Sequence, residues 1–195
     1  VEASGSRLEW KPGGRVLLYG NSFVERLREH GLFEASVQMA HAEKKLEFRS
    51  LAWTGDEVGY RLRPERYVNH LKVLLEKWPA DMVLLGFGLN ESFAGKGGLP
   101  KFRADLRGYI DEMERRHPEA VLVLFSPIAV EDTGNSLQPD PALRNGEIRA
   151  YVEAMRLVGE ERKLRFVDLF APTLAAYAES EEPLTSNGIH LNEAG

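Results

Sequence analysis

The sequence contains no cysteine, and this absence removes several kinds of chemistry at once. Disulfide bonds, thiolate nucleophiles and cysteine-based zinc sites are all excluded. Histidine is also scarce, and four of the five histidines have no paired spacing with one another or with carboxylates (His30, His41, His70 and His117). We therefore expect neither a metal site nor a cofactor.

Long hydrophobic runs and a basic stripe are missing as well. Because no run of about 18 apolar residues occurs, we expect no segment that spans a membrane. Charged residues of both signs are interspersed and the net charge is −5, so nucleic acid is not an expected partner. The 195 residues, 43% of them hydrophobic, suffice for one domain with a buried core.

Short apolar runs alternate with amphipathic stretches, which is typical of βαβ units and a parallel sheet. With right-handed crossovers, this order predicts an α/β fold: a three-layer α/β/α sandwich with a five-stranded, flavodoxin-like parallel sheet. The stretch from Pro127 to Asn145 is expected to be irregular. The predicted strands are residues 15–19, 46–52, 81–86, 121–125 and 164–169, and the predicted helices are residues 21–30, 65–78, 99–117, 148–158 and 173–179.

Polar or glycine-containing turns follow several of these strands, and ligands of open parallel sheets bind beyond the carboxyl ends of the strands. Together the turns would bring a hydroxyl, an imidazole and several amide donors to one edge of the sheet. The turns are residues 20–22 after the first strand, 53–56 after the second, 86–92 after the third, and 186–190 in the last irregular stretch.

Acyl transfer needs this combination of groups. A serine hydroxyl is a weak nucleophile until a base takes its proton, which points to Ser22 as nucleophile and His190 as base. The oxyanion of the tetrahedral intermediate needs fixed donors. The backbone N–H groups of Ser22 and Gly55 and the side-chain amide of Asn90 are the candidates.

The same four turns resemble, in order, the sequence blocks of the SGNH (GDSL-like) hydrolases. Gly20-Asn-Ser22 is similar to the family's Gly-Asp-Ser block, and Gly55 resembles its oxyanion glycine. Gly88-Leu-Asn-Glu91 is similar to its Gly-x-Asn-Asp block, and Asn187-Gly-Ile-His190 to its Asp-x-x-His block. A single match would be weak evidence, whereas four matches in order are specific.

The resemblance implies a cofactor-independent serine ester hydrolase that forms an acyl-enzyme. It points to small acyl groups, such as O-acetyl groups on carbohydrate, as substrates. Residues 88–95 also look like SGNH domains of large multidomain bacterial proteins. We therefore expect residues 1–195 to form a single domain of this type, followed by further chain and further domains. The resemblance favours an exported or periplasmic location over a cytoplasmic one.

Three positions depart from the family's pattern. Asn21 and Glu91 each replace an aspartate whose main role is to support a turn. Asn187 stands where the family has the carboxylate that orients and charges the catalytic histidine. An asparagine can accept a hydrogen bond from the ring but supplies no charge, and the exchange of aspartate for asparagine in a serine protease costs about 10⁴-fold in rate.

Asn187 leaves several alternatives open. The site can act as a Ser-His dyad with a neutral orienting group, or another carboxylate, Glu91 or Glu193, can replace the missing one. Deamidation of Asn187, which precedes Gly188, would restore an aspartate. The domain can also bind a ligand with little turnover. A thioesterase or lipase would need an acyl-chain groove, for which the stretch from Pro127 to Asn145 is the candidate.

Simpler explanations exist for the same residues. Ser22 alone would more often be a helix N-cap, and Gly55 and Asn90 alone would be turn formers. Asp168, at the end of the last strand, is expected to cap a helix rather than act as an acid. The glycines of residues 86–91 lack the third glycine of a dinucleotide fingerprint, which argues against NAD.

Overall fold

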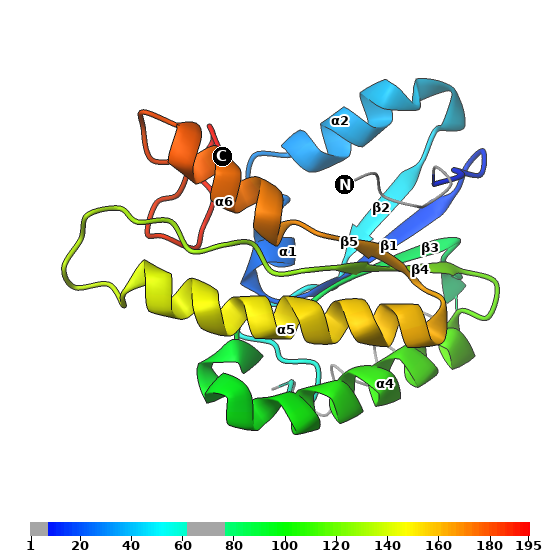
Figure 1. Cartoon of the computed structure of the whole chain (residues 1–195). Helices are drawn as coiled ribbons and strands as arrows, with labels where there is room; N and C mark the ends of the chain where they lie inside the picture. Colours follow the sequence, from blue (N-terminus) through cyan, green and yellow to red (C-terminus); the bar gives the residue numbers. More distant parts are fainter. Residues whose placement is uncertain (1–7, 62–76) are drawn as a thin grey trace.

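The computed structural model describes residues 8–61 and 77–195, which form a parallel β-sheet between helical layers (Figure 1). The sheet has five strands in the order β2-β1-β3-β4-β5, and every paired neighbour runs parallel. This is the predicted fold class, and the prediction is confirmed. The strands are β1 (Arg15–Gly20), β2 (Glu47–Ser50), β3 (Met82–Gly86), β4 (Val121–Phe125) and β5 (Arg165–Val167).

Helices cover both faces of this sheet. The long helices α4 and α5 lie on one face, and the short helices α1 and α2 lie on the other (Figure 1). Most of the predicted helix 65–78 falls outside the described residues. The helical elements are α1 (Ser22–Arg26), α2 (Leu32–Ala40), η1 (Ala42–Lys44), η2 (Glu91–Gly98), α4 (Leu99–Arg116), α5 (Pro141–Arg162) and α6 (Phe170–Glu179).

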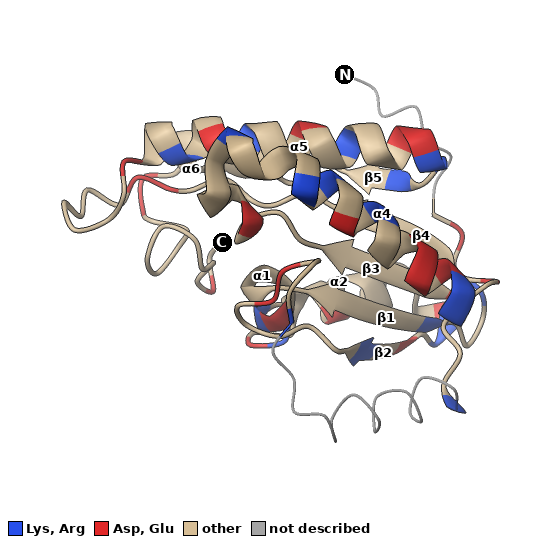
Figure 2. Ribbon diagram, turned by 90° about the horizontal axis from the view of Figure 1, so that it is seen from below, with Lys and Arg blue, Asp and Glu red and all other residues tan. Residues whose placement is uncertain are grey.

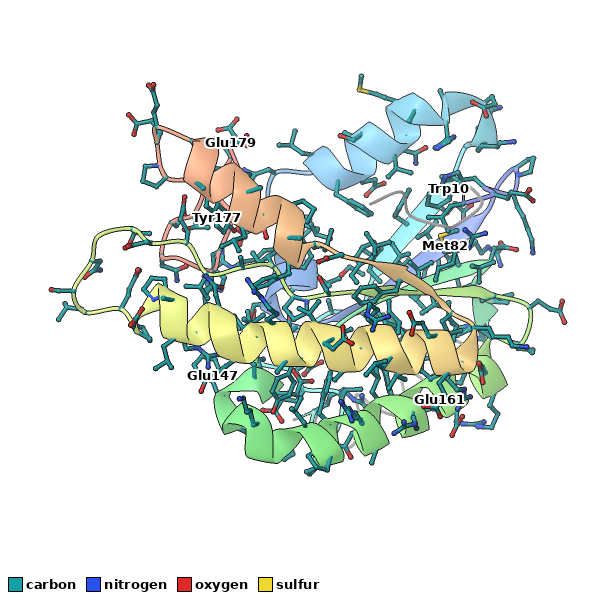
Figure 3. The ribbon with its side chains drawn as sticks, in the orientation of Figure 1. Trp10, Met82, Glu147, Glu161, Tyr177 and Glu179 are labelled. Atoms are coloured by element: carbon teal, nitrogen blue, oxygen red, sulfur yellow. The ribbon has the colours of Figure 1, made fainter. Side chains whose placement is uncertain are left out.

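The apolar strands divide their side chains between two cores, because successive residues of a strand point to opposite faces. Leu17, Leu85 and Leu124 pack with α4 and α5, and all three side chains are fully buried. The alternate positions, Leu18 and Leu84 among them, pack towards α1 and α2. Figure 3 shows Trp10 and Met82 on this second face. The sheet is thus buried on both sides, as its nearly continuous apolar strands require.

The structure corrects two boundaries and adds one helix. The helix predicted at 21–30 ends at Arg26, and α2, which was not predicted, follows from Leu32. The stretch from Pro127 to Asn145 is irregular only as far as residue 140, because Pro141 begins α5. Asp140 caps that helix, its Oδ1 accepting from the Ala142 N–H at 2.8 Å, and a proline in the first turn has no N–H that needs a partner.

Charges of both signs alternate along α4 and α5 (Figure 2), and ion pairs join the two helices. Arg107 pairs with Glu161 at 2.6 Å, and Arg162 pairs with Glu114 at 2.7 Å. Figure 3 places Glu161 near the carboxyl end of α5, opposite the end that carries Glu147. Among the described helices, none is long and apolar enough to cross a membrane.

Candidate active site

The turn that carries Ser22 is fixed by its neighbours on both sides. Asn21 is buried, its N–H donates to the carbonyl of Gly86 at 3.1 Å, and its Oδ1 accepts from the Phe23 N–H at 3.2 Å. A Cβ atom on Gly86 would overlap the side chain of Val24, as would one on Gly20. The two glycines therefore let α1 sit directly on the ends of β1 and β3, with Ser22 as its first residue.

The turn after β2 is hydrogen-bonded to the turns after β1 and β3. The Trp53 N–H donates to the Gly20 carbonyl at 3.0 Å, and Asn90 Nδ2 donates to the Asp56 carbonyl at 3.1 Å. Gly55 lies between these two contacts with φ +81°, a conformation that favours glycine. The bond to Asp56 uses one of the two N–H donors of Asn90. The turns after β1, β2 and β3 thus form one connected edge.

Glu91 links the loops after β2 and β3 through its side chain. Its side chain is buried, and its two oxygens accept from the backbone N–H groups of Val58 and Gly88, each at 2.8 Å. Burial raises the pKa of the Glu91 carboxyl, while the backbone hydrogen bonds act in the opposite direction. Glu91 therefore joins two loops, and its supporting role in catalysis stays a prediction.

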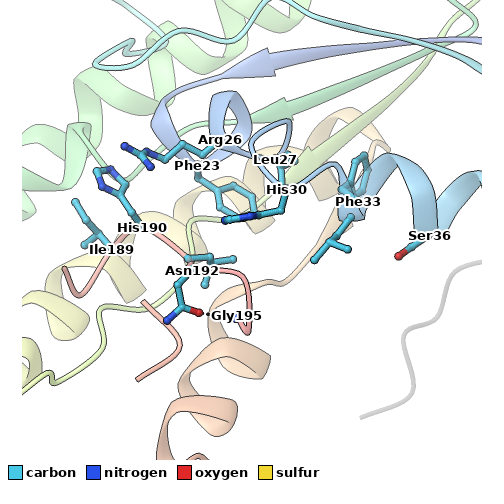
Figure 4. A pocket seen from close by; sticks show the side chains of 12 residues that line it. Phe23, Arg26, Leu27, His30, Phe33, Ser36, Ile189, His190, Asn192 and Gly195 are labelled. Carbon is cyan, nitrogen blue, oxygen red and sulfur yellow. Dashed lines mark hydrogen bonds between the residues drawn. The ribbon is translucent and has the colours of Figure 1, made fainter. Parts of the chain in front are cut away.

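His190 reaches the same region from the last loop. Its imidazole is partly buried and lies beside the Arg26 guanidinium, with Phe23 close by (Figure 4). Burial and then the positive charge of Arg26 lower the pKa of His190, and the charge of Glu29 opposes them. His190 lies beside Arg26, which follows Ser22 by four residues and so shares a face of α1 with it. Ser22 and His190 are nevertheless not hydrogen-bonded to each other in this structure.

The carboxamide of Asn187 has a defined orientation. Its Oδ1 accepts from the His190 N–H at 3.0 Å and from the Ile189 N–H at 3.4 Å. A flipped amide would set an NH₂ group against these donors, so Nδ2 is the atom that faces the ring, 3.0 Å from His190 Nδ1. An amide nitrogen only donates. The neutral ring therefore accepts at Nδ1 and carries its own proton on Nε2.

The alternative carboxylates considered above lie elsewhere. Glu91 is occupied by two backbone donors, and Glu193 is exposed without a hydrogen bond to His190. Asp168 accepts from the Phe170 N–H at 2.8 Å at the start of α6, which confirms its predicted capping role. Deamidation stays a prediction, and the Gly188 nitrogen that would attack Asn187 donates to Thr185 Oγ1 at 2.8 Å.

A cavity of about 310 Å³ adjoins His190 (Figure 4). Its walls are mainly apolar and come from α1, the start of α2 and the last loop, so the stretch from Pro127 to Asn145 does not form it. Within the described part of the chain, no three histidine or carboxylate side chains gather as they would around a metal ion. The apolar side chains lining the cavity are Phe23, Leu27, Leu32, Phe33, Ile189 and Leu191.

Two buried residues were not predicted from the sequence: Thr185, in the loop that carries His190, and Glu131, which binds that loop. Glu131 lies in the stretch that was expected to be irregular, and its partners lie more than fifty positions further along the chain. A pattern of local spacing does not reveal such a pair. The contact of Arg26 with His190 was also missed, for the same reason.

Comparison with known proteins agrees with this geometry. The family model of the GDSL-like lipase/acylhydrolase family matches residues 18–195. The fold is similar to that of a putative GDSL-like lipase from Parabacteroides merdae, with a TM-score of 0.76, 17% identity, and 96% of this chain and 92% of the other covered. It is also similar to the acetyl xylan esterase AlAXEase, with a TM-score of 0.67, 19% identity, and 91% of each chain covered.

A third similar structure is a variant of Axe2, an acetyl-xylooligosaccharide esterase from Geobacillus stearothermophilus, with a TM-score of 0.70, 16% identity, and 96% and 90% coverage. No curated protein sequence matches this chain. The matched family model covers nearly the whole chain, so the chain belongs to the GDSL-like lipase/acylhydrolase family. Membership supports hydrolysis of esters as the class of activity.

Proposed function

We propose that this domain is a serine ester hydrolase that removes small acyl groups, with O-acetyl groups on carbohydrate as the substrate class. The observation that carries the proposal is the hydrogen-bonded edge formed by the turns after β1, β2 and β3, with His190 beside Arg26 of α1. The structurally similar acetylxylan esterases support the acyl group and the alcohol.

In the proposed reaction, Ser22 Oγ forms a bond to the acyl carbon while its proton passes to His190 Nε2. The negative charge moves to the carbonyl oxygen, where the N–H groups of Ser22 and Gly55 and the second N–H of Asn90 stabilise it. Collapse of the intermediate breaks the bond to the alcohol, which takes the proton from His190. Water then attacks the acyl-enzyme with the same base and releases the carboxylic acid.

In this proposal, Asn187 limits the rate of ester hydrolysis. For His190 to accept a proton at Nε2, the ring must carry its own proton on Nδ1, whereas the amide of Asn187 favours the opposite tautomer. An aspartate would keep the oxygen that the backbone N–H groups need and present a second oxygen to Nδ1. We therefore expect Asn187→Asp to raise the rate of ester hydrolysis, by up to about 10⁴-fold.

The contact between the Asn187 amide and His190 Nδ1 also favours a second candidate function, a ligand-binding domain with little turnover. Labelling with a fluorophosphonate separates the two, because the probe bonds only to an activated hydroxyl. We expect slow labelling of the wild type, none of Ser22→Ala and fast labelling of Asn187→Asp, in parallel with hydrolysis of acetylated xylo-oligosaccharides.

The matched control is Ser36→Ala, which removes another serine that lines the cavity adjoining His190 and should label like the wild type. Equal labelling of wild type and Ser22→Ala would show that Ser22 is not the nucleophile. If neither the wild type nor Asn187→Asp is labelled, the hydrolase proposal fails and the binding domain is supported.

A further inference from the structure

Glu131 lies beneath the loop that carries His190. It follows β4 in the chain, and its side chain is only 5% exposed. Within the described residues no lysine or arginine pairs with it. A buried carboxylate needs compensation, and here the compensation comes from hydrogen-bond donors of residues 184–188.

Both carboxylate oxygens bind this loop. Oε1 accepts from the Leu184 N–H at 2.8 Å, and Oε2 accepts from the Thr185 N–H at 2.7 Å and from the Thr185 hydroxyl. The backbone adds a further link, because the Glu131 N–H donates to the Gly188 carbonyl at 2.8 Å. One residue of the segment after β4 thus fastens the loop at three positions.

The positions that bind Glu131 belong to the turn that carries His190. Thr185 Oγ1, which donates to Glu131, also accepts from the Gly188 N–H at 2.8 Å. The Ser186 N–H donates to the His190 carbonyl at 2.8 Å, and Thr185 pairs with Leu191 in an isolated antiparallel bridge. A chain of hydrogen bonds therefore runs from the Glu131 carboxylate through Thr185 to the backbone on both sides of Asn187.

We propose that Glu131 is the positioning residue of His190, acting through Thr185 and Gly188. The inference rests on the proposed function, because it assigns the residue that holds the base of that reaction in place. The carboxylate form is needed, since a glutamine has a single acceptor oxygen and would turn its NH₂ group towards one of the loop's N–H donors. A base displaced by about 1 Å can lose about 100-fold in rate.

The test compares Glu131→Gln with wild type in two measurements. Hydrogen–deuterium exchange of residues 180–195 reports the loop directly and does not depend on turnover, and we expect faster exchange at Leu184, Thr185 and Gly188. Kinetics on an acetyl ester should show kcat reduced by about 10- to 100-fold, with KM changed by less than about twofold. Thr185→Ser should retain wild-type values, whereas Thr185→Ala should resemble Glu131→Gln.

Tyr177→Phe is the matched control. Tyr177 points from α6 towards the segment after β4 (Figure 3). The pKa of Tyr177 is raised, mainly by burial and to a smaller extent by the negative charge of Glu131. Its buried hydroxyl has no hydrogen-bond partner among the described residues, so we expect its removal to leave exchange and kcat unchanged.

A folded Glu131→Gln variant with wild-type exchange and wild-type kcat would overturn the inference, as would an equal effect in Tyr177→Phe. If the wild type fails to hydrolyse esters while Glu131→Gln still accelerates exchange of the loop, the proposed function fails and the anchoring role of Glu131 remains.

Discussion

At the scale of single residues, the site depends on which nitrogen of His190 carries the proton. Three factors disfavour a charged ring, against the charge of Glu29: burial, the positive charge of Arg26, and the Asn187 amide that donates to Nδ1. Together they keep the ring neutral, which a general base requires. They do not keep the ring's own proton on Nδ1, as the proposed reaction requires, and Asn187 opposes that arrangement.

The acid limb of the pH–rate profile tests this environment. His190 must be neutral to accept a proton, so kcat/KM falls as the pH drops through its pKa. That pKa is lowered from the usual 6.5, which places the limb below pH 6.5. Arg26→Gln removes a positive charge and frees the carboxylate of Glu29, its partner at 2.8 Å, so the limb should move to higher pH. The measurement is kcat/KM for 4-nitrophenyl acetate between pH 4 and 8.

Arg28→Gln provides the control for this shift. Arg28 lies just beyond α1, pairs with Glu25 and does not contribute to the lowered pKa of His190. Its removal should leave the limb where it is in the wild type. A limb that stays in place, or moves to lower pH, in Arg26→Gln would contradict the assignment of His190 as the base.

At the scale of helices and strands, side chains from outside the site hold its loops together. Glu91 joins the start of η2 to the loop after β2, and Tyr151 of α5 donates to the Gly95 carbonyl at 2.8 Å. Arg144, also from α5, binds the Ser92 hydroxyl at 2.8 Å. The loop that carries Asn90 is therefore fixed to the long helix of the α4–α5 layer.

Glu91→Gln should destabilise this arrangement. The glutamine has one acceptor oxygen for two buried N–H groups, so either Val58 or Gly88 loses its partner, at a cost of about 1–3 kcal/mol. We expect the midpoint of urea unfolding to fall, and kcat to fall with it because Asn90 is the neighbouring residue. Glu153→Gln, an exposed change on α5, is the control and should leave both quantities close to wild type.

The sequence was sufficient to predict those elements whose signal is local. The strands are short apolar runs, and α4 repeats its buried side chains with helical spacing, as at Phe102, Leu106 and Ile110. The start of α5 was missed although Asp140-Pro141 is a helix-start signal. The signal for α2 is weaker, since none of its residues is fully buried and Phe33 packs only half-buried against the second core. The bonds of Glu131 and Arg26 arise from tertiary contacts alone.

At the scale of the whole molecule, the two helical layers that cover the sheet differ in how many residues they bury. Helix α5 buries nine residues and α4 buries five, whereas α1 buries only Val24 and α2 buries none. Ser22 and Arg26, which lies beside His190, belong to the layer of α1 and α2, the shallow layer. Within the described residues, the proposed nucleophile therefore lies in the helical layer that buries fewer side chains.

Native-state hydrogen exchange should reveal this difference. Elements with few buried contacts open locally, at a lower free energy than global unfolding, while well-packed helices exchange only when the molecule unfolds. Amides of residues 22–40 should therefore exchange through local opening that is insensitive to low urea, and those of α5 should follow the global transition. Esterase activity should then disappear at a lower urea concentration than the far-ultraviolet dichroism, which α4 and α5 dominate. Equal protection of the two layers, with activity and dichroism lost together, would mean that the shallow layer is as firmly held as the deep one.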